Sequence, residues 1–341
     1  MARETGRSTL AGIAAEAGVS VSAVSKVLNG RTDVAAATRA RIAALLRRDG
    51  YQVASRLGFG VVDLLIATLH TPWAEELLRG TVQAADEAGA SVVVSTVDSP
   101  GGFTAWLNRA TARGTDGALT VLNLPDSSEL QRLAAARIPL VVIDPPQEPG
   151  PGIRSVGTTN WQGCLTATRH LIELGHRRIA IIGGPEQLWS SRARLAGYRA
   201  ALEAAGLPAA GELIRRDEFC AEGGRRQARE LLALPQPPTA IVAGNDAQAF
   251  GVLQALGERG LRAPQDLSVV GFDDVPVASW ATPALTTIRQ PLAAMAATAF
   301  RMLHAPGSGT SGASGAGEPH HVELATTLVI RESTGPPPKV R

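Results

Sequence analysis

The sequence predicts an all-α three-helix head followed by an α/β body made of two doubly wound parallel-sheet subdomains. Three observations support this fold class. Residues 9–29 read as two short helices around a tight turn, the net charge changes sign near residue 58, and strand and helix patterns alternate after residue 60. A chain of 341 residues exceeds the usual size of one domain, so at least two domains are expected.

The first stretch has the pattern of a helix-turn-helix. In its first helix, apolar residues recur at helical spacing and should face inward; they are Leu10, Ile13, Ala14 and Ala17. Gly18 can adopt the positive φ that ends a helix, and the Ser20 hydroxyl can cap the next one. If Val24, Val27 and Leu28 of the second helix pack inward, the outward side of that helix carries small and basic residues, which are Val21, Ser22, Ser25 and Lys26. Such a pair fits a DNA major groove, although an ordinary αα-hairpin in a bundle has the same pattern.

A third helix is expected over residues 36–49, and the charge distribution helps to choose between these two readings. Residues 1–58 hold nine Lys or Arg against four Asp or Glu, a net charge of +5, whereas the remaining residues have a net charge of −3. A basic head on a mildly acidic body favours contact with a polyanion such as DNA. The basic residues of the third helix alone would also fit a solvated surface helix.

From residue 61 onward, short apolar runs alternate with amphipathic stretches. The expected strands are 61–69, 91–97, 117–122, 140–144, 178–184, 240–246 and 267–274, and a last strand is expected over 321–329. The expected helices between them include 73–88, 127–136, 161–174, 192–205, 223–234 and 247–260. This alternation predicts βαβ units in parallel sheets, and its length favours two subdomains. Residues 305–318 are a low-complexity Gly/Ser/Ala stretch.

Polar residues follow several of the expected strands. Ligands of open α/β sheets bind outside the carboxyl ends of the strands, so these residues are candidates for ligand binding. They are His70, Thr71, Asn123, Asp144, Asn245, Asp246, Asp273 and Asp274, with Arg194 on a following helix. Aromatic rings could stack on sugar faces or belong to the core; they are Trp73, Trp161, Trp189, Phe219 and Trp280. Some of the acids, Asp246 above all, could instead cap helices.

The sequence contains no pattern that indicates catalysis. It lacks a phosphate-loop motif and a Gly-x-Ser-x-Gly elbow, and the spacing of its six histidines does not fit zinc. We therefore expect no catalytic residue, metal or cofactor. Two cysteines, Cys164 and Cys220, do not make a disulfide framework. Without a membrane-length apolar run or a signal peptide, a cytoplasmic, nucleoid-associated protein is expected.

Several stretches together resemble the LacI family of bacterial transcription repressors. They are TLAGIAAEAGVSVSAVSKVLNG (9–30), HLIELGHRRIAIIGG (170–184), RLAGYRAAL (194–202), IVAGND (241–246), VVGFDD (269–274), PALTTIRQP (283–291) and LVIREST (328–334). The resemblance implies a homodimer whose heads read a pseudo-palindromic double-stranded operator. It also implies a body like a periplasmic sugar-binding protein, with an effector between subdomains that the chain joins by three crossings.

On this basis the head with its connector is 1–58 and the body is 59–341. The first subdomain would cover about 60–158 and 292–318, and the second about 160–289 and 320–335.

The resemblance also assigns roles to individual residues. Val21, Ser22 and Lys26 would face base edges, whereas Ser20, Ser25 and Asn29 would contact or position the phosphate backbone. The full expected DNA-binding set is Thr9, Ser20, Val21, Ser22, Ser25, Lys26, Asn29, Arg31, Arg56 and Leu57. Arg194, Asn245 and Asp273 match positions that hold sugar hydroxyls in sugar-responsive members. Asp144, Phe219, His70 and Thr71 match such positions less closely. Trp73 and Trp189 complete the expected ligand contacts as candidates for stacking on a sugar ring.

The chain departs from the family pattern in the connector. Tyr-x-Pro-Asn-x-x-Ala-Arg-x-Leu is usual there, but residues 51–60 read YQVASRLGFG, which lacks Pro-Asn and is shorter. Leu57 could still act as a minor-groove wedge, or be an apolar linker residue. The head also has Gly12, Ala23 and Ala35 where the family usually has Asp, Thr and Ser.

These features predict a dimeric repressor that a small sugar releases from its operator. A purine-type corepressor would be compatible with the same Arg194 and Asp273. A sugar-processing enzyme with a fused DNA-binding head is the alternative from another functional class.

Overall fold

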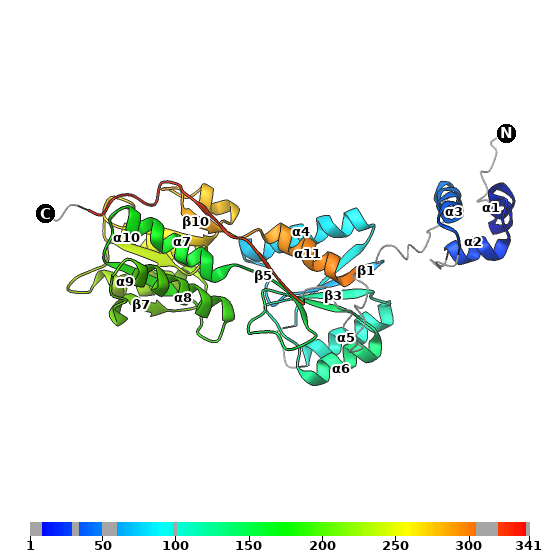
Figure 1. Cartoon of the computed structure of the whole chain (residues 1–341), viewed down its shortest axis with the longest axis horizontal. Coiled ribbons are helices and arrows are strands. Elements are labelled where there is room, and N and C mark those ends of the chain that lie inside the picture. Colours follow the sequence, from blue (N-terminus) through cyan, green and yellow to red (C-terminus); the bar gives the residue numbers. More distant parts are fainter. Residues whose placement is uncertain (1–8, 29–33, 50–59, 98–100, 305–319, 339–341) are drawn as a thin grey trace.

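A computed structural model describes residues 9–28, 34–49, 60–97, 101–304 and 320–338. It contains a three-helix head and two α/β subdomains, each built on a six-stranded sheet (Figure 1). No single helix in these ranges is long and apolar enough to cross a membrane. The first two helices, bent by 108° to each other, pass that length and composition test only as a pair.

The head consists of α1 (Leu10–Ala17), α2 (Val21–Leu28) and α3 (Ala36–Arg48). The predicted turn forms as expected. Gly18 ends α1 with φ of 64°, and the Ser20 hydroxyl accepts a hydrogen bond from the Ala23 amide at 3.2 Å. Apolar side chains of all three helices form one small core; the buried ones are Ile13, Ala14, Ala17, Val24, Val27, Ile42 and Leu46.

The first sheet has the strand order β11-β5-β4-β3-β1-β2, and all of its pairings are parallel. Its strands are β1 (Val61–Leu65), β2 (Ser91–Ser95), β3 (Gly117–Val121), β4 (Leu140–Ile143), β5 (Arg154–Thr158) and β11 (His321–Leu324). Two helices cover each face, as alternating side chains of a buried parallel strand require. One face packs on α4 (Pro72–Ala88) and α11 (Leu292–His304), and the other on α5 (Gly102–Arg113) and α6 (Ser127–Ala136).

The second sheet has the order β12-β10-β9-β8-β6-β7 and is parallel except for β12. Its strands are β6 (Ile179–Gly183), β7 (Ile214–Arg216), β8 (Ala240–Ala243), β9 (Ser268–Asp273), β10 (Thr286–Arg289) and β12 (Thr327–Val329). One face packs on α7 (Asn160–Glu173) and α8 (Trp189–Ala204), and the other on α9 (Ala221–Leu232) and α10 (Asp246–Glu258). A Cβ atom on Gly197 of α8 would lie 2.1 Å from the carbonyl oxygen of Trp161, so only glycine allows α7 and α8 to pack this closely.

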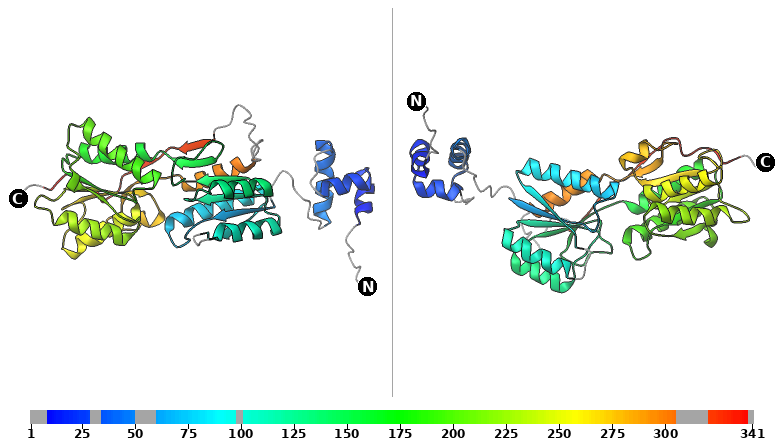
Figure 2. Two further views of the ribbon diagram at one scale, coloured as in Figure 1. Left: turned by 90° about the horizontal axis from the view of Figure 1, so that it is seen from below. Right: turned by 180° about the vertical axis from the view of Figure 1, so that it is seen from behind.

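The chain passes between the two sheets at three places: from β5 to α7, from β10 to α11 and from β11 to β12. Figure 2 shows these segments joining the subdomains along one side. Two of them are tied together, because the Thr159 hydroxyl accepts a hydrogen bond from the Thr326 amide at 2.9 Å. Since the linking segments are few, the angle between the subdomains can change without disrupting either core.

The placement of the last segment corrects an expectation. A single strand over 321–329, with all of 320–335 in the second subdomain, is wrong. β11 pairs in parallel with β5 of the first sheet, and only β12 joins the second. β5 leaves an open edge whose backbone groups need partners, and the apolar pattern of 321–329 does not show which sheet edge satisfies them. The structure also contains α5, β5, β7 and β10, which the sequence patterns did not identify.

Candidate ligand cleft and nucleic-acid interface

The outward face of α2 carries the residues predicted to read DNA. Val21 is 48% exposed and Ser22 is also exposed, whereas Ser25 and Lys26 are partly covered. Ser20 and Thr9 are exposed as well, but their hydroxyls cap α2 and α1. Opposite them, Val24 and Val27 anchor the helix in the head core. The other predicted DNA contacts, Asn29, Arg31, Arg56 and Leu57, lie outside the described residues.

A cavity of about 460 Å³ lies between the two subdomains. Its walls come from the carboxyl ends of β1, β3 and β4 on one side and from the ends of β8 and β9 on the other. Eight of the nine predicted ligand-binding residues line it: His70, Thr71, Trp73, Asp144, Arg194, Phe219, Asn245 and Asp273. Apolar and aromatic side chains dominate the wall, with a few converging polar groups, as is typical of small-molecule sites.

Arg194 is the fixed polar centre of this cavity. It is only 4% exposed, its Nε donates to Asn160 Oδ1 at 2.8 Å, and its Nη1 donates to the Gly244 carbonyl at 2.5 Å. Its guanidinium stacks on the Phe272 ring, 3.8 Å from the centroid. Burial lowers the pKa of Arg194, while Asp273 and Asp144 act to raise it. Among the described residues, Arg194 forms no ion pair with either carboxylate, and all three side chains line the cavity. A ligand can therefore lie among them.

Asp273 ends β9 at the bottom of the cavity. It is 5% exposed, and its Oδ1 accepts a hydrogen bond from Gln290 Nε2 at 2.6 Å. Burial raises the pKa of Asp273 to about 7, although Arg194 and the Gln290 hydrogen bond lower it. Gln290 in turn accepts from the Thr158 hydroxyl at 2.8 Å, which links the cavity to the β5 crossing. Gln290 was not among the predicted ligand residues; its position directly after β10 is the signal that could have found it.

The structure reassigns two neighbouring side chains at the start of α10. Capping of this helix was the alternative role for Asp246, but Asn245 caps it by accepting from the Gln248 amide at 2.9 Å. Asp246 is fully buried and accepts instead from the Thr287 hydroxyl and the Val275 amide. Burial first, and then the nearby Asp273, raise the pKa of Asp246 well above its usual value. Asn245 thus lines the cavity while also capping a helix.

Other predicted residues at the cavity are partly occupied by local contacts. The Thr71 hydroxyl caps α4 by accepting from the Ala74 amide at 3.2 Å, and His70 contacts the Thr68 hydroxyl. Phe219 lies against Gly184, where a Cβ atom would come within 2.1 Å of its ring. Gly184 therefore makes room for an aromatic side chain of the cavity. Asp274, another candidate for ligand binding, forms ion pairs with Arg289 and Arg331 at 2.6 Å each.

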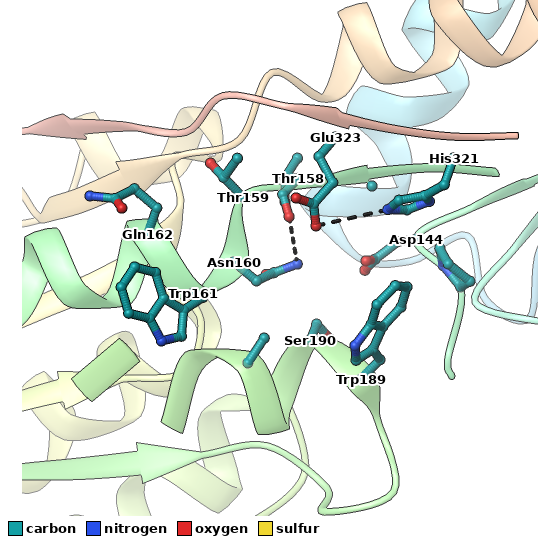
Figure 3. Close-up of a pocket in the computed structure, with 13 residues that line it drawn as sticks. Asp144, Thr158, Thr159, Asn160, Trp161, Gln162, Trp189, Ser190, His321 and Glu323 are labelled. Carbon is teal, nitrogen blue, oxygen red and sulfur yellow. Dashed lines mark hydrogen bonds and ion pairs between the residues drawn. The ribbon is translucent and has the colours of Figure 1, made fainter. Parts of the chain in front are cut away.

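The ninth predicted residue, Trp189, lies in a second cavity of about 300 Å³ (Figure 3). This cavity shares Asp144 and Ser190 with the first. Trp161 lines it too, whereas Trp280, another candidate for stacking, lines neither cavity and is 74% exposed. Within the described ranges, no group of three or more His, Cys, Asp or Glu residues could hold a metal ion.

Comparisons with known proteins agree with this arrangement. Residues 9–53 match the family model of bacterial regulatory proteins of the lacI family, and residues 168–334 match a periplasmic binding protein-like domain. The chain is 32% identical to the HTH-type transcriptional regulator DegA of Bacillus subtilis (strain 168), across 97% of this chain and 99% of DegA.

Two solved structures extend the comparison. The transcriptional regulator CelR in complex with cellobiose superposes with a TM-score of 0.71 at 32% identity, covering 96% of this chain and all of the other. A lac repressor dimer bound to operator and the anti-inducer ONPF gives a TM-score of 0.70 at 30% identity, covering 96% and 99% of the two chains.

Proposed function

The chain belongs to the lacI family of bacterial regulatory proteins, and from this premise we propose that it is a homodimeric repressor released from its operator by a small sugar. The observation that carries the proposal is the cavity between the subdomains. It brings Arg194, Asp273 and Gln290 together with the aromatic side chains of Trp73 and Phe219, which suits a ligand with several hydroxyls and an apolar face. The similar CelR structure holds cellobiose.

The sugar would act by changing the angle between the subdomains. Asp144 and Trp73 come from the first subdomain, and Arg194, Asn245 and Asp273 from the second, so one ligand contacts both. A ligand shifts the equilibrium only by its difference in affinity for the two angles. Release from DNA therefore requires that the sugar bind the DNA-incompetent arrangement more tightly, by roughly 1–3 kcal/mol for a typical allosteric coupling.

Operator recognition in this proposal belongs to two copies of the head. The outward face of α2 would enter the major groove, with Val21, Ser22 and Lys26 at base edges. Dimerisation would use exposed apolar side chains of the body, of which Trp280 is the most exposed. Trp280 directly follows the 3-10 helix Pro276–Ser279, whose Val277 lines the cavity, so ligand binding and subunit contact share one segment. A regulator of this kind acts in the bacterial cytoplasm.

A role without catalysis completes the proposal. The polar groups of the cavity are hydrogen-bonded to the protein: Arg194 to Asn160 and Gly244, Asp273 to Gln290. Polar groups held in this way can bind and orient the hydroxyls of a ligand without reacting with it. A purified protein that converts candidate sugars at a measurable rate would favour the enzyme alternative.

The experiment begins with selection of an operator from a random duplex pool by the full-length protein. A thermal-shift screen of sugars and nucleobases then identifies ligands, and operator affinity is measured with and without each one. We expect a sugar both to stabilise the protein and to weaken operator binding. Arg194→Met should abolish the sugar response, whereas Arg199→Met, on the exposed face of the same helix, should preserve it. A nucleobase that stabilises the protein and strengthens operator binding would replace the sugar proposal with a corepressor.

A further inference from the structure

The second cavity carries features of a ligand site that the first cavity does not explain. It lies between the edge strand β11 and the first turns of α7 and α8, and thus between the two subdomains (Figure 3). Asp144 and Ser190 form a wall common to both cavities, so the two spaces adjoin. With about 300 Å³, the second cavity is large enough for one sugar ring.

His321 has an unsatisfied nitrogen in this cavity. Its Nδ1 lies 2.8 Å from the Ser155 hydroxyl, but its buried Nε2 has no hydrogen-bond partner among the described residues. A carboxylate oxygen of Glu323 lies 3.8 Å away, which is too long for a hydrogen bond. Leaving such a group unpaired is costly, and a hydroxyl placed between His321 and Glu323 would satisfy both.

Trp189 provides an apolar surface beside these polar groups. Its ring lies against His321 with a centroid distance of 5.4 Å, and its backbone amide donates to the Pro146 carbonyl at 2.7 Å. That bond holds the start of α8 to the first subdomain. Trp161, at the start of α7, is 43% exposed and lines the same cavity. A pyranose ring has one apolar face and a rim of hydroxyls, and so matches the Trp189 indole with the His321 imidazole and the Glu323 carboxylate nearby.

We propose that the second cavity is a subsite for a second sugar unit, with Trp189 as its stacking face and Glu323 and His321 as its hydroxyl partners. The inference rests on the proposed sugar response and specifies its ligand class. The unit would be either a separate monosaccharide or the second ring of a disaccharide. Such a disaccharide would extend from the first cavity, past Asp144 and Ser190, into the second. Because both subdomains line the subsite, its occupant adds to the same change of interdomain angle.

The test uses isothermal titration of the full-length protein with cellobiose, maltose, lactose, melibiose, sucrose and trehalose, and with their constituent monosaccharides. The variants are Trp189→Ala and Glu323→Gln, and Glu87→Gln on the exposed surface of α4 is the control. Retained operator binding and circular dichroism check that each variant folds. If the ligand is a disaccharide, we expect one site per protomer, with affinity lowered at least about tenfold in both variants and unchanged in the control. The affinity for its monosaccharide in the first cavity should stay within about twofold.

Two monosaccharides bound per protomer, falling to one in Trp189→Ala, would identify separate ligands as the source. A sugar that binds both variants as tightly as the wild type would overturn the subsite and leave the proposed sugar response intact. If no sugar in the panel binds the wild type or alters operator affinity, the proposed function fails, and the subsite fails with it.

Discussion

Asp273→Asn should make the stability of the body less dependent on pH. The carboxyl of Asp273 is buried, and its pKa is raised to about 7, chiefly by burial. In the unfolded chain the pKa is about 3.9. At a pH between these two pKa values, Asp273 is ionised in the unfolded chain but protonated in the folded body. The folded body is therefore stabilised by its protonated Asp273. This contribution to the free energy of unfolding is complete below about pH 4 and is lost as the pH rises through 7.

The magnitude follows from the two pKa values. A difference of about three, at about 1.36 kcal/mol per pKa unit, means that ionised Asp273 costs roughly 4 kcal/mol above pH 8. Between pH 5 and pH 8 the change is roughly 2–3 kcal/mol, because part of the loss has already occurred at pH 5. Asparagine keeps an Oδ1 acceptor for Gln290 and has nearly the same shape as aspartate, so the φ of 126° at this position strains both residues alike. The variant should therefore gain roughly 2–3 kcal/mol relative to the wild type between these pH values.

The assay is urea unfolding of ligand-free protein at several pH values. All five tryptophans lie after residue 60, so tryptophan fluorescence reports the body and not the head. Asp86→Asn, an exposed carboxylate on α4, serves as the control and should follow the wild type. If Asp273→Asn also runs parallel to the wild type from pH 5 to pH 8, burial does not control this carboxyl, and the reasoning is refuted.

Three further variants and one control substitution test other parts of the molecule. Lys26→Ala should cost about 1–3 kcal/mol in operator binding and relax specificity at one base pair, as measured with single-base operator variants; uniform weakening on all sequences would instead indicate a phosphate contact. Gly197→Ala should destabilise the body by at least about 1–3 kcal/mol in urea, since its methyl group would overlap the Trp161 carbonyl. Gly257→Ala, which meets open space in α10, should be neutral or stabilise by up to about 1 kcal/mol. Trp280→Glu should shift the protein toward monomers in sedimentation velocity, and an unchanged dimer would place the interface elsewhere.

The head could be predicted closely because its signals are local. The positions of Gly18 and Ser20, and the spacing of Ile13, Val24 and Val27, are encoded within twenty consecutive residues. The structure confirms both caps and the inward side of each helix. In the body, the apolar runs likewise identified the central buried strands β1, β3, β6, β8 and β9, since strands covered on both faces are apolar along their length.

Short and edge strands gave weaker signals. β7 has three residues and β5 contains Arg154 and Gly157, so neither stands out as an apolar run. The split of the last segment into β11 and β12 depends on which sheet edge is open at each point, and no pattern within 321–329 contains that information.

By itself, the sequence determined the class of the protein and the residue types available for its ligand, because helix caps, turn residues and strand patterns act over a few neighbours. Only the tertiary structure decided how those residues are used. It assigned the cap of α10 to Asn245 and buried Asp246 against Thr287, brought Gln290 to Asp273, and separated Trp189 from Trp73 into adjoining cavities. The physical reason is that these contacts join residues far apart in the chain, and their geometry follows from the packing of two sheets across three crossings.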